Sequence, residues 1–200
     1  MTTKHLENAA RAVLETANIA LGSTATETRV SVVGGLSIPL YEAIRIVDIS
    51  QDVDIFLGGN VNRHELKKAL HVVDSAFIVN MEGICGVTYR CPVAKVITPV
   101  DLIDRVVTGF EPRLRILAEL EKWELPWPTR EDVISMKAIS ASEWEDDAKR
   151  RQDVMDIMKI LEMHTGSLQL SSLAFMKNQM PMLVQNSTWS EEEWARYLGI

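Results

Sequence analysis

The stretch from Arg29 to Leu57 places the strongest constraint on how this chain folds. It reads as an apolar strand at Val30–Val33, a Gly34-Gly35 pair, a short helix and a second strand that begins beside Asp52. Because glycine has no Cβ, the pair lets the backbone turn sharply between strand and helix. Side chains on a strand repeat every two residues, so Asp52 and Asp54 share one face. The stretch therefore predicts a strand–helix–strand unit with two carboxylates held close together.

Two like charges at this separation repel each other, and a bound cation or a shared proton relieves the repulsion. The Gly34-Gly35 turn brings backbone N–H groups at a helix start within reach of a phosphate, and Ser37 is the hydroxyl best placed to contact it. We therefore predict that Asp52 and Asp54 bind Mg²⁺, with phosphates at Gly34, Gly35 and Ser37. The alternative is a plain strand-to-helix turn in which Ser37 is an ordinary helix-start residue.

The order Val32-Val33-Gly34-Gly35 followed by Asp52-Val53-Asp54 resembles the signature of the nucleotidyltransferase-fold superfamily, which includes polymerase-β-like transferases. The resemblance covers about residues 25–105 and is greatest to the small branch of bacterial antitoxin-system and antibiotic-modifying transferases. It implies transfer of a nucleoside monophosphate from an NTP, with Mg²⁺ as cofactor. In that branch a Tyr and an Arg often lie between the two motifs, which makes Tyr41 and Arg45 candidate contacts for phosphate or base. Arg45 pairing with Asp48 is the structural alternative.

The resemblance also implies a third carboxylate that completes the metal site and helps to deprotonate the acceptor. We expect it on the strand over residues 84–90, but that segment contains no acid. Asp101 and Asp104 are predicted to lie on a following helix, because Thr98-Pro99 reads as an N-cap and a first helical residue. The missing acid motivates a second hypothesis, a catalytically decayed or repurposed protein that binds a ligand or protein partner. A third is that Asp-x-Asp is a polar strand edge on another α/β fold.

The composition of the chain limits the classes of partner that it is expected to bind. The 200 residues carry a formal net charge of -7, which disfavours a long nucleic-acid substrate and favours a nucleotide with a small-molecule or protein acceptor. No apolar run approaches the roughly 18 residues of a membrane span, so no membrane partner is expected. The N-terminus has no signal-peptide core, and a cytoplasmic location is the default expectation.

The expected fold class is α+β. Residues 1–108 are predicted to form a nucleotidyltransferase-like core, a mixed β-sheet with helices on one side, and residues 109–200 a helical region packed on it. Met176, Met180 and Met182 are read either as flexible apolar filler or as a homodimer surface.

Overall fold

The computed structural model describes residues 4–41, 52–79, 86–163, 168 and 173–200. It divides into two compact units, and each is described by itself. The first unit comprises residues 1–36 and 47–128, and the second comprises residues 37–46 and 129–200. Whether residues 1–108 form an independent domain stays a prediction.

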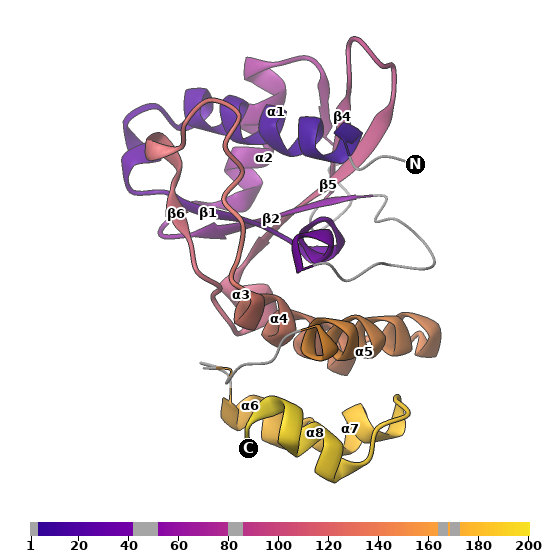
Figure 1. Cartoon of the computed structure of the whole chain (residues 1–200). Helices are drawn as coiled ribbons and strands as arrows, with labels where there is room; N and C mark the ends of the chain where they lie inside the picture. The colour runs from indigo at the N-terminus through magenta and orange to yellow at the C-terminus, as the bar shows by residue number, and fades with distance from the viewer. Residues whose placement is uncertain (1–3, 42–51, 80–85, 164–167, 169–172) are drawn as a thin grey trace. The chain divides into compact units, whose positions relative to one another are not determined.

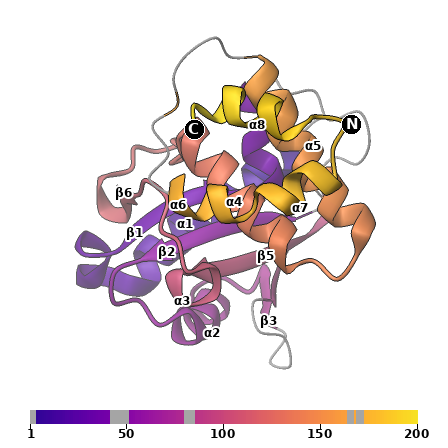
Figure 2. The same ribbon diagram turned by 90° about the horizontal axis from the view of Figure 1, so that it is seen from below.

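A mixed sheet of six strands organises the first unit (Figure 1). The strand order is β3-β4-β5-β2-β1-β6. The pair of β2 and β5 is parallel and the other pairs are antiparallel. Figure 2 shows β1, β2 and β5 side by side. The strands are β1 Arg29–Val33, β2 Val53–Gly58, β3 Phe77–Val79, β4 Gly86–Arg90, β5 Ile97–Asp104 and β6 Arg115–Ile116.

The core of the first unit lies on one face of this sheet. Helices α1 (Lys4–Leu21) and α2 (Arg63–Val73) bury their apolar sides against the inward residues of β1, β2, β4 and β5. Asn62 begins α2 as an N-cap, because its side chain accepts hydrogen bonds from the N–H groups of His64 and Glu65. The unit is completed by η1 (Gly22–Thr26), α3 (Arg105–Thr108) and η3 (Leu117–Glu119). The prediction of a mixed sheet with helices packed on it is confirmed.

The second unit is helical, as expected for the C-terminal region. Its helices are α4 Arg130–Glu143, α5 Asp147–Glu162, α6 Leu173–Asn178, α7 Met180–Gln185 and α8 Glu191–Leu198. Capping boxes begin α4 at Thr129 and α8 at Ser190. Met176 and Met180 are buried in the core of this unit together with Trp194.

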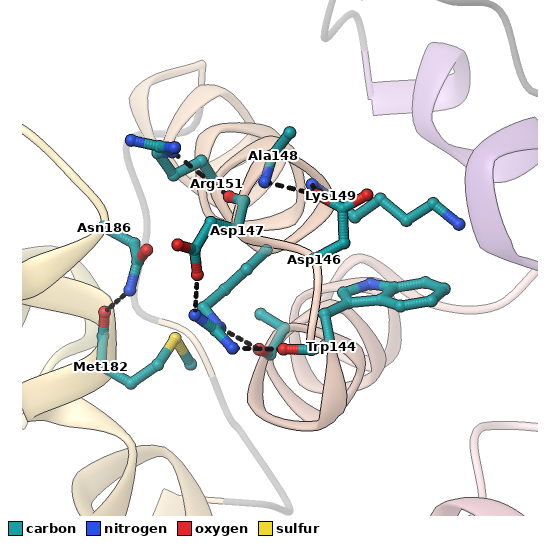
Figure 3. A network of polar contacts seen from close by, with 10 residues as sticks. Trp144, Asp146, Asp147, Ala148, Lys149, Arg151, Met182 and Asn186 are labelled. Carbon is teal, nitrogen blue, oxygen red and sulfur yellow. Dashed lines mark hydrogen bonds and ion pairs between the residues drawn. The ribbon is translucent and has the colours of Figure 1, made fainter.

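Polar contacts hold the turn between α4 and α5 (Figure 3). Asp146 caps α5 by accepting hydrogen bonds from the N–H groups of Ala148 and Lys149. The Arg150 guanidinium donates to the carbonyl of Trp144 and pairs with Asp147. The sequence pattern predicts one helix over residues 143–163, and these contacts hold a turn before α5, which begins at Asp147.

The sequence pattern also predicts helices over residues 98–107 and 114–123, and neither forms as a continuous helix in the described structure. The segment over residues 98–107 is mostly strand β5, and residues 114–123 contain β6 and the single turn η3. The strand expected over residues 93–97 is a turn that joins β4 to β5, with Ile97 as the first strand residue. No helix among the described residues is long and apolar enough to cross a membrane.

Candidate metal centre

Three aspartates meet on the outer face of the sheet, opposite the face that α1 and α2 cover. Asp54 is on β2, and Asp101 lies directly beside it on the parallel strand β5. Asp52 immediately precedes β2. One carboxylate oxygen from each of the three lies within 4.8 Å of the other two, and all three side chains are half-buried. Among the described residues, this is the only cluster of three or more acidic, histidine or cysteine side chains spaced to hold a metal ion.

Asp101 corrects the expectation for the third carboxylate. The acid was sought on the strand over residues 84–90, and Asp101 was placed on a helix. Instead Asp101 is in the middle of β5, and Gly86 is its register partner on β4. The burial of β5 alternates, with Thr98, Val100 and Leu102 inward and Asp101 on the opposite face. In the sequence this period of two shows only at Val100-Asp101-Leu102, because the inward Thr98 is polar and the outward Ile97 is apolar.

The other acid considered, Asp104, has a structural role at the far end of β5. Its side chain caps α3 by accepting a hydrogen bond from the N–H of Val107. It also pairs with Arg63 of α2, with 3.6 Å between Nε and Oδ2. The side chain of Asp104 therefore stabilises the fold through α3 and Arg63, and it lies outside the cluster of three aspartates.

The geometry of the cluster opposes the ionisation of Asp101. Burial raises the pKa of the Asp101 carboxyl above its ordinary value, and the negative charge of Asp52 raises it further. The positive charge of Lys67, a buried residue of α2, acts in the opposite direction and lowers the pKa of Asp101. A carboxylate whose ionisation is opposed in this way gains from a bound cation.

Gly34 is required by the cluster itself. Its φ is +69°, a conformation that favours glycine. A Cβ placed on Gly34 would lie only 2.7 Å from Cγ of Asp54 and closer still to one carboxylate oxygen. Val33, the residue before it, is the register partner of Asp54 on β1. The absence of a side chain at residue 34 therefore makes room for the Asp54 carboxylate.

The remaining predicted site residues fall into different parts of the chain. Gly35 follows in the 3-10 helix η2 (Gly34–Tyr41), which stands where the sequence suggested a short α-helix. Ser37 is fully buried and belongs to the second unit. The backbone of Tyr41 ends η2, and its side chain is outside the described part of the structure, as is the whole of Arg45. Ser37, Tyr41 and Arg45 stay predictions.

A second group of buried charges went unnoticed in the sequence. Lys137 of α4 pairs with Asp153 and Asp156 of α5, with Nζ–O distances of 2.5 Å and 3.1 Å. The Trp144 indole N–H donates to Asp153, and the Gln152 amide donates to Asp156. Lys137 lies on one helix and the two acids on the next, so the spacing in the sequence resembles that of ordinary solvated helix faces.

The donor set fits a hard divalent cation. Mg²⁺ and similar ions prefer carboxylate oxygens, and three carboxylates from two neighbouring strands offer several such ligands on one side. Carboxylates arranged in this way can hold a cation that also binds the phosphates of a nucleotide.

Comparison with known proteins supports the same fold. Neither a protein-family model nor a curated protein sequence matches this chain. Among solved structures, the chain is similar to an antigenic nucleotidyltransferase-like protein from Paracoccidioides brasiliensis. The TM-score is 0.58 at 15% sequence identity, and the match covers 94% of this chain and 92% of the other. The chain therefore has a nucleotidyltransferase-like fold, with an acidic cluster on the outer face of its sheet.

Proposed function

We propose that this protein is a Mg²⁺-dependent nucleotidyltransferase that moves a nucleoside monophosphate from an NTP to a hydroxyl of a small-molecule or protein acceptor. The observation that carries the proposal is the convergence of Asp52, Asp54 and Asp101. A decayed site was the rival hypothesis because a third carboxylate was missing from the expected strand. Asp101 supplies that carboxylate from β5, which removes the main ground for the rival.

The aspartates have distinct tasks in this proposal. Asp52 and Asp54 would hold the cation, whose positive charge would favour binding of the triphosphate. Asp101, which lies beside Asp54 on β5, would complete the metal site and is the proposed acceptor of the proton of the acceptor hydroxyl. When bound, Mg²⁺ supplies charge neutralisation at the α-phosphate and at the departing pyrophosphate.

The glycine turn serves the same site. Gly34 leaves space for Asp54, and the backbone N–H groups of Gly34 and Gly35 are the proposed contacts for phosphate. We include Ser37, Tyr41 and Arg45 as proposed nucleotide contacts on the resemblance described above. The small antitoxin-system or antibiotic-modifying type and the cytoplasmic location also belong to the proposal.

Calorimetric titration of ATP, GTP, CTP and UTP, with and without Mg²⁺, tests the proposal. Wild-type protein should bind at least one nucleotide in a Mg²⁺-dependent manner, and Asp52→Asn should abolish that binding while the fold keeps its stability. Glu119→Gln is the matched control, because it removes one negative charge from an exposed residue on η3. No binding of any of the four nucleotides by the wild type would contradict the proposal and favour the repurposed protein.

A further inference from the structure

The outer face of the sheet is covered on one side of the aspartates and open on the other. Ser31 of β1 and Phe56 of β2 share this face with Asp54, and both are 0% exposed. Toward the start of β5 and on β3, the same face is open, because Ile97 of β5 is 58% exposed and Ile78 of β3 is 42% exposed. A molecule that lies along the sheet and reaches the aspartates therefore approaches over β5, β4 and β3.

The open half-face has a defined composition. The register places Thr88 of β4 between Pro99 of β5 and Ile78 of β3, and places Arg90 opposite Ile97. We call Ile78, Thr88, Arg90, Ile97 and Pro99 the platform. Ile97 precedes Asp101 by four residues on the same strand, so the platform extends about 13 Å from the metal centre.

The far end of the platform is positively charged. Arg90 is exposed and takes part in none of the ion pairs found among the described residues. Lys95 is exposed in the turn that joins β4 to β5. The turn is closed by two backbone hydrogen bonds, from Lys95 N–H to the Cys91 carbonyl and from Cys91 N–H to the Val96 carbonyl.

Lys95 occupies a backbone conformation that does not suit it. Its φ is 54°, and this left-handed region costs a residue with a Cβ about 1–2 kcal/mol relative to glycine. None of the hydrogen bonds of the turn uses the lysine ammonium group: two join backbone groups, and in a third the Ala94 N–H donates to the Cys91 sulfur. A lysine held at such a cost points to a use for its ammonium group.

We propose that the platform receives the acceptor as an extended polypeptide. The acceptor hydroxyl lies at the aspartates, and an acidic side chain four residues away lies at Arg90 and Lys95. The inference rests on the proposed nucleotidyl transfer and specifies its acceptor. An extended chain advances about 3.3 Å per residue, so four residues span the same distance as the platform.

A polypeptide fits this surface better than a nucleic acid does. A nucleic acid carries a phosphate on every nucleotide, so a strand that reached Arg90 would first place phosphates over Ile78, Ile97 and Pro99. The side chains of these three residues carry no charge that could pair with a phosphate. A peptide with apolar or neutral residues between its hydroxyl and its acidic residue places no charge over the uncharged part of the platform.

The reaction balances without a further reactant. The acceptor hydroxyl oxygen forms a bond to the α-phosphorus of the NTP, and the bond from that phosphorus to the bridging oxygen of pyrophosphate breaks. The hydroxyl proton passes to a carboxylate of the cluster and then to water. The products are the nucleotidylated peptide, pyrophosphate and one proton.

Peptide pools test the proposal. Each pool has a central Ser, Thr or Tyr and a fixed Glu, Gln or Lys four positions to either side, with random neutral residues elsewhere. The full-length protein, Mg²⁺ and a mixture of the four α-³²P-labelled NTPs are added, and label transferred to peptide is measured. We expect the Glu pool to be labelled about fivefold more than the Gln pool, the effect of exposed charge pairs.

Variants identify the platform as the origin of that preference. Arg90→Glu should shift labelling to the Lys pool. Lys95→Gly should reduce the preference for Glu while the melting temperature stays equal or rises, because the strained backbone is relieved. Lys68→Glu is the control, because it reverses an exposed charge on α2, which covers the other face of the sheet.

The outcomes separate this inference from the proposed function. Equal labelling of all pools, no labelling of any pool, or labelling of an oligoribonucleotide instead would overturn the platform inference. If Mg²⁺-dependent nucleotide binding persists in calorimetry in those cases, the metal–nucleotide site stands. Loss of that binding in the wild type would overturn both.

Discussion

Replacing Gly34 with alanine should damage the metal centre far more than it damages the fold. The added Cβ would begin 2.7 Å from Cγ of Asp54, whereas ordinary contact starts at 3.4 Å. The Oδ2 atom of Asp54 would be closer still, 1.8 Å from the Cβ, so the carboxylate has to retreat by about 1.6 Å to reach ordinary contact. Because it is the end of a short side chain, rotation moves it away from its partners at modest cost to stability. A displacement of about 1 Å at a catalytic group can cost on the order of a hundredfold in rate.

Gly22→Ala provides the matched control. Gly22 also has a positive φ, +53°, but a Cβ there would meet nothing within 4 Å. Both variants should lose about 1–2 kcal/mol of unfolding free energy from the left-handed backbone, measured by urea denaturation. Only Gly34→Ala should lose Mg²⁺-dependent nucleotide binding, by about tenfold or more in calorimetry. Equal nucleotide binding by Gly34→Ala and Gly22→Ala would refute the claim that this glycine makes room for Asp54.

Three further predictions concern charge and backbone strain. Because the pKa of Asp101 is raised, the folded protein holds more protons than the unfolded chain just above the ordinary carboxyl pKa, so this group's contribution to stability falls as pH rises through that range. Asp101→Asn should therefore raise the metal-free melting temperature above that of the wild type by more at pH 7 than at pH 4. The same difference between mutant and wild type at both pH values would contradict this. Lys137→Met should cost about 3–5 kcal/mol of unfolding free energy, because it leaves Asp153 and Asp156 buried without the lysine ammonium group. A loss below about 1 kcal/mol in denaturant titration would show that water reaches the two aspartates. Trp123 has a φ of 78° and is 64% exposed, so Trp123→Gly should raise the unfolding free energy by up to about 1 kcal/mol. A clear drop in melting temperature would contradict this and indicate that the Trp123 side chain packs against the fold.

The half of the site that lies close together in the sequence was predictable. Asp52 and Asp54 are two residues apart next to an apolar strand, and the Gly34-Gly35 pair precedes a helical turn, so local rules of strand alternation and glycine turns identify them. The α+β class followed from the same patterns and from the capping signal at Asn62. Local geometry was sufficient for these features.

The third carboxylate was missed for two physical reasons. Thr98-Pro99 has the chemistry of a helix start, and the alternation of β5 is seen in burial but is broken in the sequence by the inward Thr98 and the outward Ile97. The partner of Asp101 is Asp54, which precedes it by 47 positions and is reached only through the parallel pairing of β2 and β5. A single sequence does not specify such a long-range pairing, so the local pattern offered no way to bring Asp101 to Asp54.

Electron paramagnetic resonance of Mn²⁺ tests the central claim most directly, because Mn²⁺ takes the same oxygen ligands as Mg²⁺ and its free signal disappears on binding. We expect wild-type protein to bind Mn²⁺ in the presence of the NTP selected by calorimetry. Asp101→Asn should weaken that binding by tenfold or more, and Glu119→Gln should leave it unchanged. Wild-type binding that survives unaltered in Asp101→Asn would contradict the account, because Asp101 would then take no part in holding the cation.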